Sequence, residues 1–266
     1  MEQISVASWE DFDKRLEDLR QERASSQGAE SGLLFRGQEN SCWSLSTTLD
    51  RKRELMPFAE YYHVISRIRP QVESLTDREW PIPEYPEVEK LSKQYELYDS
   101  LWCGRCPGYS YMAYLRHHGF PSPLLDWSRS PYVAAFFAFN KAAENSNGRV
   151  SIYVFSHVPY KLHGNAIRMV LPYGHYVKTH RRHFLQQSEY TLCVAFQSEW
   201  QFERYDTVFE EGFYQQGICQ KFDIPATERR KVMSELDAYN VNALSLFGSE
   251  ESMMETLATR EFSLTP

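Results

Sequence analysis

A chain of 266 residues with 42% hydrophobic and 24% charged residues has the composition of a globular protein with a substantial core. Its formal net charge of −7 excludes binding of duplex DNA by general phosphate attraction, which requires a basic excess. The N-terminal residues lack a basic-then-apolar signal, and no apolar run reaches membrane-spanning length. We therefore expect a cytoplasmic protein without membrane contact.

The cysteines and the aromatic residues bear on the kind of ligand. Cys103 and Cys106 make a lone C-x-x-C without a second pair at zinc spacing, so we expect no metal site. Aromatic residues form 15% of the chain, which leaves rings to line a pocket for a flat ligand. One basic cluster is either a solvated loop or a local nucleic-acid contact, and it consists of Lys178, His180, Arg181, Arg182 and His183.

The first part of the chain is predicted to be rich in helices. A helix over Trp9–Glu22 has its apolar residues on one face, and a second is expected over Phe58–Ile68. Between them a short strand, Gly32–Phe35, stops at Arg36, where the following glycine lets the backbone turn away. Trp80–Pro86 contains three prolines, is predicted to be non-helical and is the best candidate for a linker.

Further along, a helix is expected over Tyr109–His118, followed by an extended segment, Leu124–Ser128. A very apolar helix should start at Pro131 and run, buried, through Ala143. Helices first and strands second predict an α+β fold with a mainly antiparallel sheet and a helix-rich N-terminal half, in one domain spanning residues 1–266. The later strands are expected at Val150–Phe155, Ile167–Leu171, Tyr190–Phe196 and Ile218–Ile224, and the closing helices at Arg229–Tyr239 and Glu250–Thr259.

Three segments carry residues suited to chemistry. In the first, Leu34–Gln38, Arg36 is either a structural ion-pair partner or a guanidinium fork for the oxygens of a diphosphate. In the last, Gln186–Leu192, Glu189 enters a strand. It is either solvated or, if it faces a cleft, able to stabilise the positive charge of an opening glycosidic bond.

The middle segment, Arg116–Ser128, crowds titratable groups together. His117, His118 and Asp126 could serve a metal hydrolase, but adjacent histidines on a helix point about 100° apart and rarely share one ion. Two alternatives remain. Either one imidazole and Asp126 hold a loop together while Ser128 faces a ligand, or the segment is a hydrogen-bonded turn without a ligand.

Together the three segments resemble the FRG domain family. A weaker match near the C-terminal end extends the resemblance over nearly the whole chain. The residues that carry it are Phe35-Arg36-Gly37, His117 to Ser122 leading into Leu124–Ser128, Arg182 spaced before Gln186, and the weaker Lys221 to Pro225 and Leu246-Phe247.

The same positions resemble the Arg-Ser-Glu signature of ADP-ribosyltransferases, which implies a split antiparallel sheet core. The resemblance assigns Arg36 to the NAD phosphates, Ser128 to support of the nicotinamide ribose and Glu189 to catalysis. Asp126 departs from the first serine of that superfamily's motif but fits the FRG pattern. Glu189 departs from the Gly-x-Phe common in FRG sequences, and Pro123 replaces a usual FRG arginine.

The activity that the resemblance implies is transfer of ADP-ribose from NAD. Glu189 would stabilise the oxocarbenium as nicotinamide leaves, and aromatic side chains such as Trp127 or Tyr111 would flank the nicotinamide. The implied catalytic set is Arg36, Gln187 and Glu189, and the implied NAD-binding set is Arg36, Gly37, Gln38, Tyr111, His117, Asp126, Trp127 and Ser128.

Gln187 bears on the acceptor, because in that superfamily Gln at this position goes with amide side chains or nucleobases. A Gln amide can donate and accept, as a base edge requires. The resemblance therefore implies a bacterial toxin of a toxin–antitoxin or phage-defence system that modifies RNA in preference to an Asn or Gln side chain, with an antitoxin protein as partner. NAD hydrolysis and a non-catalytic nucleotide- or partner-binding module are the alternatives. Gln197-Ser198-Glu199 repeats the Gln-x-Glu pattern and makes Glu199 a rival catalytic carboxylate.

Overall fold

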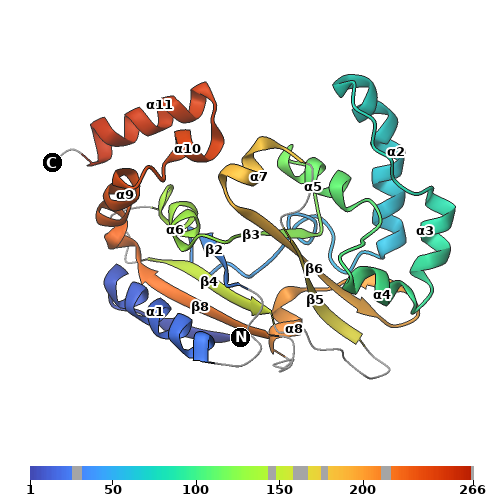
Figure 1. The fold of residues 1–266 in the computed structure, drawn as a ribbon, viewed down its shortest axis with the longest axis horizontal. Coiled ribbons are helices and arrows are strands. Elements are labelled where there is room, and N and C mark those ends of the chain that lie inside the picture. Colours follow the sequence, from blue (N-terminus) through green and yellow to red (C-terminus); the bar gives the residue numbers. More distant parts are fainter. Residues whose placement is uncertain (26–31, 143–147, 158–166, 175–178, 211–216, 265–266) are drawn as a thin grey trace.

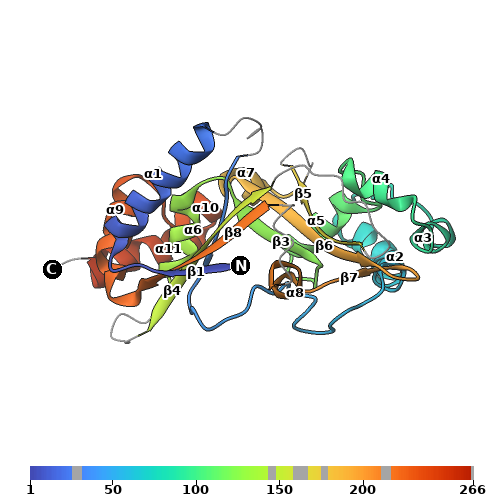
Figure 2. The ribbon, with the colours of Figure 1, turned by 90° about the horizontal axis from the view of Figure 1, so that it is seen from below.

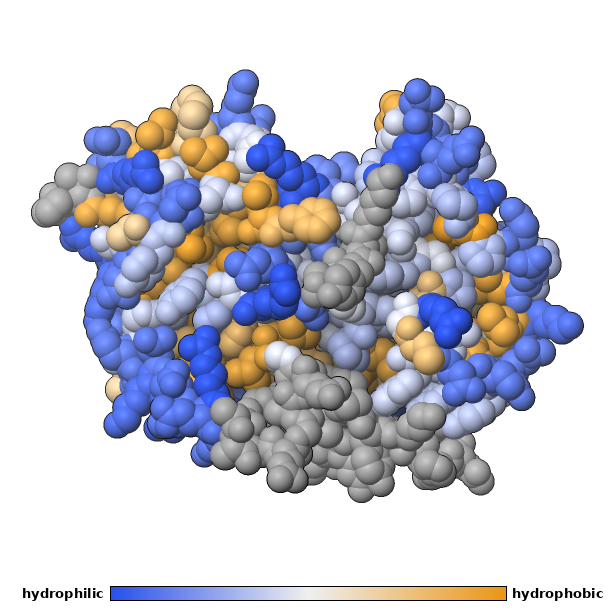
Figure 3. Space-filling view, in the orientation of Figure 1, coloured by the Kyte–Doolittle hydropathy of each residue, from blue (hydrophilic) through white to orange (hydrophobic). Residues whose placement is uncertain are grey.

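The computed structural model describes residues 1–25, 32–142, 148–157, 167–174, 179–210 and 217–264. One sheet crosses the middle of the molecule, and helices gather at its two ends (Figure 1). Figure 2 shows α1 and α9 at one end and α2 and α3 at the other, with the sheet strands between them. The surface is hollowed between α10 and α11 on one side and α2 on the other (Figure 3).

The described strands form an eight-stranded sheet in the order β1-β8-β4-β2-β3-β6-β5, with β7 paired to β6. β1 and β8 run parallel, and the other neighbours are antiparallel. The prediction of a mainly antiparallel sheet is confirmed. The bounds are β1 Glu2–Ser5, β2 Leu34–Gln38, β3 Leu124–Ser128, β4 Arg149–His157, β5 Ile167–Tyr173, β6 Ser188–Phe196, β7 Trp200–Phe202 and β8 Gly217–Pro225.

The junction between β2 and β3 is the narrowest point of this sheet. Phe35 and Ser128 form the one register pair between the two strands. In contrast, all five residues of β2 pair with β4, and all five residues of β3 pair with β6. The two halves of the sheet therefore separate on one side of the Phe35–Ser128 pair.

Helices flank both halves of the sheet. A 3₁₀ turn (Ala226–Glu228) precedes the last three helices of the chain, and a π-helical turn (Arg260–Leu264) follows them. The last five described helices, α7 to α11, follow or interrupt the strand-rich part of the chain. The bounds are α1 Trp9–Ser25, α2 Phe58–Thr76, α3 Tyr85–Ser92, α4 Leu97–Trp102, α5 Tyr109–His117, α6 Pro131–Phe139, α7 Arg181–Leu185, α8 Tyr205–Glu210, α9 Arg229–Ala238, α10 Ala243–Phe247 and α11 Glu250–Thr259.

Two large apolar clusters hold the helices on the sheet. One packs α1, α6 and α9 against β4 and β8, with Phe12, Phe136 and Phe222 at its centre. The other packs α2 to α5 against β5 and β6 and contains Tyr62 and Trp200. Each cluster buries large aromatic rings, so each half of the sheet has its own apolar core, formed with a different set of helices.

α6 is shorter than its apolar sequence predicts. Ser130 caps its first turn by accepting a hydrogen bond from the Val133 N–H, and Pro131 follows as the first helical residue. The helix ends at Phe139, and Ala143, its expected last residue, lies outside the described residues. The predicted start is confirmed, and the predicted length is wrong by at least three residues because an apolar run alone does not mark a helix end.

The proline-rich segment Trp80–Pro86 is anchored to the core by Trp80. Trp80 is 4% exposed, and the Tyr62 hydroxyl donates to the Pro83 carbonyl at 2.6 Å. Tyr85 and Pro86 form the first turn of α3, where proline is tolerated because the first N–H groups of a helix have no helical partner. The expectation of a non-helical stretch thus holds up to Glu84, and the segment is a largely exposed connection that Trp80 anchors to the core.

No helix among the described residues combines the length and the apolar character needed to cross a membrane.

Candidate functional site

The candidate site lies where β2 and β3 separate. α6 packs across β2 at this point, and the approach is so close that a Cβ on Gly37 would overlap the Ala134 carbonyl oxygen and lie 2.6 Å from the Ala138 backbone nitrogen. Gly37 is therefore required for helix–strand packing. That packing fixes the direction of the neighbouring side chains, Arg36 and Gln38.

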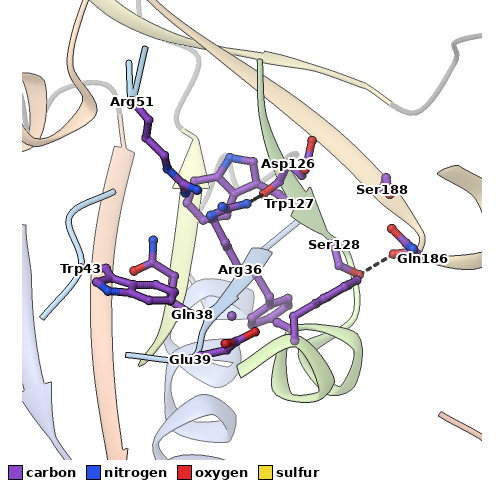
Figure 4. A pocket seen from close by; sticks show the side chains of 14 residues that line it. Arg36, Gln38, Glu39, Trp43, Arg51, Asp126, Trp127, Ser128, Gln186 and Ser188 are labelled. Atoms are coloured by element: carbon purple, nitrogen blue, oxygen red, sulfur yellow. Dashed lines mark hydrogen bonds between the residues drawn. The ribbon is translucent and has the colours of Figure 1, made fainter. Parts of the chain in front are cut away.

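A cavity of about 240 Å³ opens at this separation (Figure 4). It is bordered by β2, the turn after β2, the end of β3, the first turns of α6 and the start of β6. Its lining residues are Phe35, Arg36, Gly37, Gln38, Glu39, Trp43, Arg51, Asp126, Trp127, Ser128, Ala134, Phe137, Gln186 and Ser188.

Arg36 fills the gap between the separating strands. Its Nη1 donates to the Asp126 carbonyl at 2.8 Å, a bond visible in Figure 4. Its buried Nε has no hydrogen-bond acceptor among the described residues. Burial lowers the pKa of Arg36 to about 10, with the negative charge of Asp126 acting in the opposite direction, so the guanidinium stays charged at neutral pH. A cation with an unsatisfied donor fits an anionic ligand.

The Asp126 carboxylate is held by a different arginine. Arg116 of α5 donates to both of its oxygens, each at 2.5 Å, and to the Thr48 hydroxyl at 2.8 Å. Burial would raise the pKa of Asp126, but the charge and hydrogen bonds of Arg116 outweigh it and lower that pKa. Asp126 lines the cavity as predicted, yet its charge is compensated, and the partner that sequence reasoning missed is Arg116.

Ser128 holds two chain segments together at the cavity edge. Its hydroxyl donates to the Gln186 carbonyl at 2.8 Å and accepts from the Ser130 N–H at 3.1 Å. Ser128 is 5% exposed and lines the cavity, and its hydroxyl already has protein partners. The strand end thus fixes the turn that precedes β6.

The two predicted aromatic residues do not form a ring-binding slot. Trp127 borders the cavity, but its indole N–H donates to the Thr191 hydroxyl at 2.8 Å and its ring packs on Phe155. Tyr111 is fully buried in the other half of the molecule, with its ring 5.2 Å from Trp80. The prediction that Tyr111 contacts NAD is wrong for this cavity, because its helix face serves the core.

His117 is also outside the cavity lining. Its Nε2 lies 2.6 Å from the Tyr190 hydroxyl, which also lies 3.2 Å from Nδ1 of His183. Burial lowers the pKa of His117 to about 4, so the imidazole is neutral at physiological pH. The lining of this cavity therefore gives no support to the NAD-binding role predicted for His117. Among the described residues no group of three His, Cys, Asp or Glu side chains forms a metal site.

Glu189 and Gln187 flank the cavity without lining it. Glu189 is the register partner of Trp127 and lies beside Ser188, a lining residue. Paired residues of antiparallel strands share a face of the sheet, so Glu189 is on the same face as Trp127. Its carboxylate is half-buried and lies 3.8 Å from Nε of Arg129. Gln187 is exposed and has a positive φ of 48°, a conformation that few non-glycine residues adopt.

Glu199, the rival carboxylate, lies at the other end of β6. It is in the turn between β6 and β7 and is near enough to Tyr85 and Lys93 to act on them electrostatically. Ser188, at the near end of β6, lines the cavity, and a nine-residue strand separates the two ends by about 30 Å. Of the two glutamates, Glu189 is therefore the one beside the cavity.

Several cavity residues were not predicted as binding residues. Trp43, which is 51% exposed, and the exposed Arg51 come from the loop after β2. Loop geometry decides their place at the cavity, and no periodic pattern marks them. Glu39, Phe137 and the pair Gln186 and Ser188 join them from three different segments.

The predicted basic cluster forms the short helix α7. Arg181 is exposed, His183 is buried, and the guanidinium of Arg182 lies over the Phe247 ring. Lys178 lies outside the described residues. α7 leads directly into the Gln186–Ser188 turn at the cavity, so the solvated-loop interpretation is wrong for this segment.

Comparison with known families matches residues 31–147 to the FRG domain. Comparisons with curated proteins and with solved structures give no match. The matched range contains β2 and β3, which carry Arg36, Asp126 and Ser128. Residues 31–147 are thus similar to the FRG domain family, in agreement with the motifs.

Proposed function

We propose that this protein is an NAD-dependent ADP-ribosyltransferase. The observation that carries the proposal is the cavity at the β2–β3 separation, which brings Arg36 and Ser128 to one opening with Glu189 at its border. These residues come from three segments far apart in the chain. Each has the residue type that the chemistry requires at that position.

The charge balance of the cavity favours an anion. Asp126 is compensated by Arg116, which leaves Arg36 and Arg51 against Glu39 among the charged lining residues. The unsatisfied Arg36 Nε–H is a donor for a phosphate oxygen. A diphosphate, with two negative charges, suits this arrangement.

The size and the walls of the cavity favour a ligand that places a flat ring inside it and extends beyond its mouth. Phe35, Ala134 and Phe137 supply apolar wall, and the volume of about 240 Å³ is slightly below the roughly 300–1,000 Å³ usual for small-molecule sites. The cavity would therefore enclose part of a dinucleotide, and the rest would lie along its mouth.

In the proposed reaction the bond between the nicotinamide nitrogen and ribose C1′ breaks, and nicotinamide leaves with the bonding electron pair. Glu189 accepts a hydrogen bond from the ribose 2′-OH, and its negative charge stabilises the oxocarbenium. A lone pair of the acceptor then forms the new bond at C1′, and the acceptor releases its proton to solvent. Glu189 lies on β6, the direct neighbour of β3, so a ligand that spans the cavity edge would reach it.

We further propose that Gln187 contacts the acceptor and that this acceptor is a nucleobase of RNA. Gln187 is exposed beside Glu189, and its amide can both donate and accept, as a base edge requires. α7, with the exposed Arg181, lies immediately before it and offers a local positive charge for phosphates. In this proposal the protein is a toxin held in check by an antitoxin.

Incubation with NAD labelled in its adenylate part and with cell lysate tests the proposal. We expect label on a macromolecule that nuclease releases and protease does not. Release by protease alone would move the acceptor to a protein side chain. Free labelled ADP-ribose without any attached label would identify a hydrolase, and NAD left intact would refute an enzymatic function.

A further inference from the structure

We propose that Gln38 and Trp43 form the adenine subsite of this cavity, with Gln38 reading the adenine 6-amino group. The inference rests on the proposed use of NAD and specifies which end of the dinucleotide lies where. It also predicts a discrimination between adenine and other purines.

Gln38 supplies an acceptor that no described residue satisfies. The residue is 5% exposed and lines the cavity. Its Nε2 donates to the Ser44 carbonyl at 3.2 Å, which fixes the orientation of the amide, while its buried Oε1 has no donor within the described part of the chain. A buried acceptor without a donor is unfavourable, so a ligand N–H at this place gains a hydrogen bond and removes that penalty.

Trp43 supplies a flat apolar surface beside Gln38 (Figure 4). Its side chain is 51% exposed at the cavity, although its backbone is held by the Tyr153 hydroxyl, which donates to the Trp43 carbonyl at 3.3 Å. An indole exposed at a cavity edge on an anchored backbone is suited to stack on a purine.

The position of this pair selects the adenine end of NAD. Gln38 and Trp43 lie on the opposite side of the cavity from Gln186 and Ser188, which border Glu189 (Figure 4). The nicotinamide–ribose bond must lie near Glu189 if that carboxylate acts on it. The other ring then falls at Gln38 and Trp43, with Arg36 and the diphosphate between the two ends. The adenine 6-amino group is a donor, as the free Oε1 requires.

Two substitutions at position 38 separate this role from the structural hydrogen bond. Gln38→Met and Gln38→Glu both remove the donor to Ser44, but only Glu keeps an acceptor at the Oε1 position, next to the compensating charge of Arg36. Binding of NAD and of nicotinamide hypoxanthine dinucleotide, which carries an oxo group in place of the 6-amino group, is measured by calorimetry for the three proteins. Thermal unfolding of each verifies the fold.

We expect the unsubstituted protein and Gln38→Glu to bind NAD roughly tenfold or more tightly than the hypoxanthine analogue, and Gln38→Met to bind both alike. Trp43→Phe should lose the fluorescence quenching that NAD and ADP-ribose cause and nicotinamide mononucleotide, which lacks adenine, does not. Discrimination that persists unchanged in Gln38→Met, with NAD still bound, would overturn the subsite and leave the proposed function intact. Absence of NAD binding by the unsubstituted protein would overturn both.

Discussion

At the scale of single residues, two titratable groups, one on α5 and one on β3, are held in a defined charge state by their surroundings. Asp126 is charged because Arg116 pairs with both of its oxygens, and His117 is neutral because burial disfavours its cation. The sequence marks neither Arg116 as the partner of Asp126 nor the burial of His117. The crowding of polar residues between 116 and 128 is visible in the sequence, but which of them pair depends on the packing of α5 against β3.

Removing Arg116 should destabilise the protein moderately. Arg116→Met leaves the Asp126 carboxylate, whose side chain is 39% exposed, without its main counter-charge, and solvent screening limits the cost to about 1–2 kcal/mol. The double variant Arg116→Met with Asp126→Asn should recover part of that loss, because no charge then remains unpaired. Urea unfolding of the three proteins measures this, and equal stability of Arg116→Met and the unsubstituted protein would refute the pairing.

His117 should make stability depend on pH between about 6.5 and 4. Its pKa is lowered from 6.5 to about 4 in the folded state, so in this range the unfolded chain binds the extra proton. The stabilisation is fully present above pH 6.5 and is lost as the pH falls towards 4, by up to about 3 kcal/mol. His117→Phe should flatten that part of the curve. NMR titration of the His117 ring gives an independent reading, and a midpoint near 6.5 would contradict the account.

At the scale of elements, most strands and the long helices were predictable and the short elements were not. β2 is an exception: the strand expected to stop at Arg36 runs through Arg36 and Gly37 to Gln38, because pairing with β4 holds the glycine in the strand. β3 has the bounds that its sequence predicts, since a run of apolar residues between turn signals defines it. β1, β7, α8 and α10 have three to six residues each, too few to show a period, and they form because the rest of the fold packs against them. The contact of α6 with β2, which requires Gly37, is likewise set by tertiary packing.

Gly37→Ala should therefore destabilise the protein by about 1–3 kcal/mol or more, because the added methyl group meets backbone atoms of α6 that cannot move independently. Gly32→Ala is the matched control, since an added Cβ there has nothing within 4 Å. Denaturant unfolding of both variants measures the difference. Similar stability of the two would show that α6 does not lie against β2 as described.

At the scale of the whole molecule, the candidate site exists only because distant segments meet at the separation of the sheet halves. The Arg36 and Ser128 motifs could be predicted as parts of one site from their resemblance to a known pattern, and the fold brings them to one cavity. The positions of Trp43 and Arg51, and the exclusion of Tyr111, could not be predicted, because loop paths and helix rotation are set by the complete core.

In the proposed function Glu189 acts on NAD at this cavity, and Glu199, in the turn that follows the same strand, provides the matched control. The most direct measurement is the rate of nicotinamide release from NAD, in the presence of lysate, for Glu189→Gln and Glu199→Gln, with NAD affinity measured in parallel. We expect Glu189→Gln to bind NAD and lose at least about a thousandfold in rate, as removal of a charge-stabilising group does, while Glu199→Gln keeps a normal rate. A normal rate in Glu189→Gln together with an inactive Glu199→Gln would contradict the account.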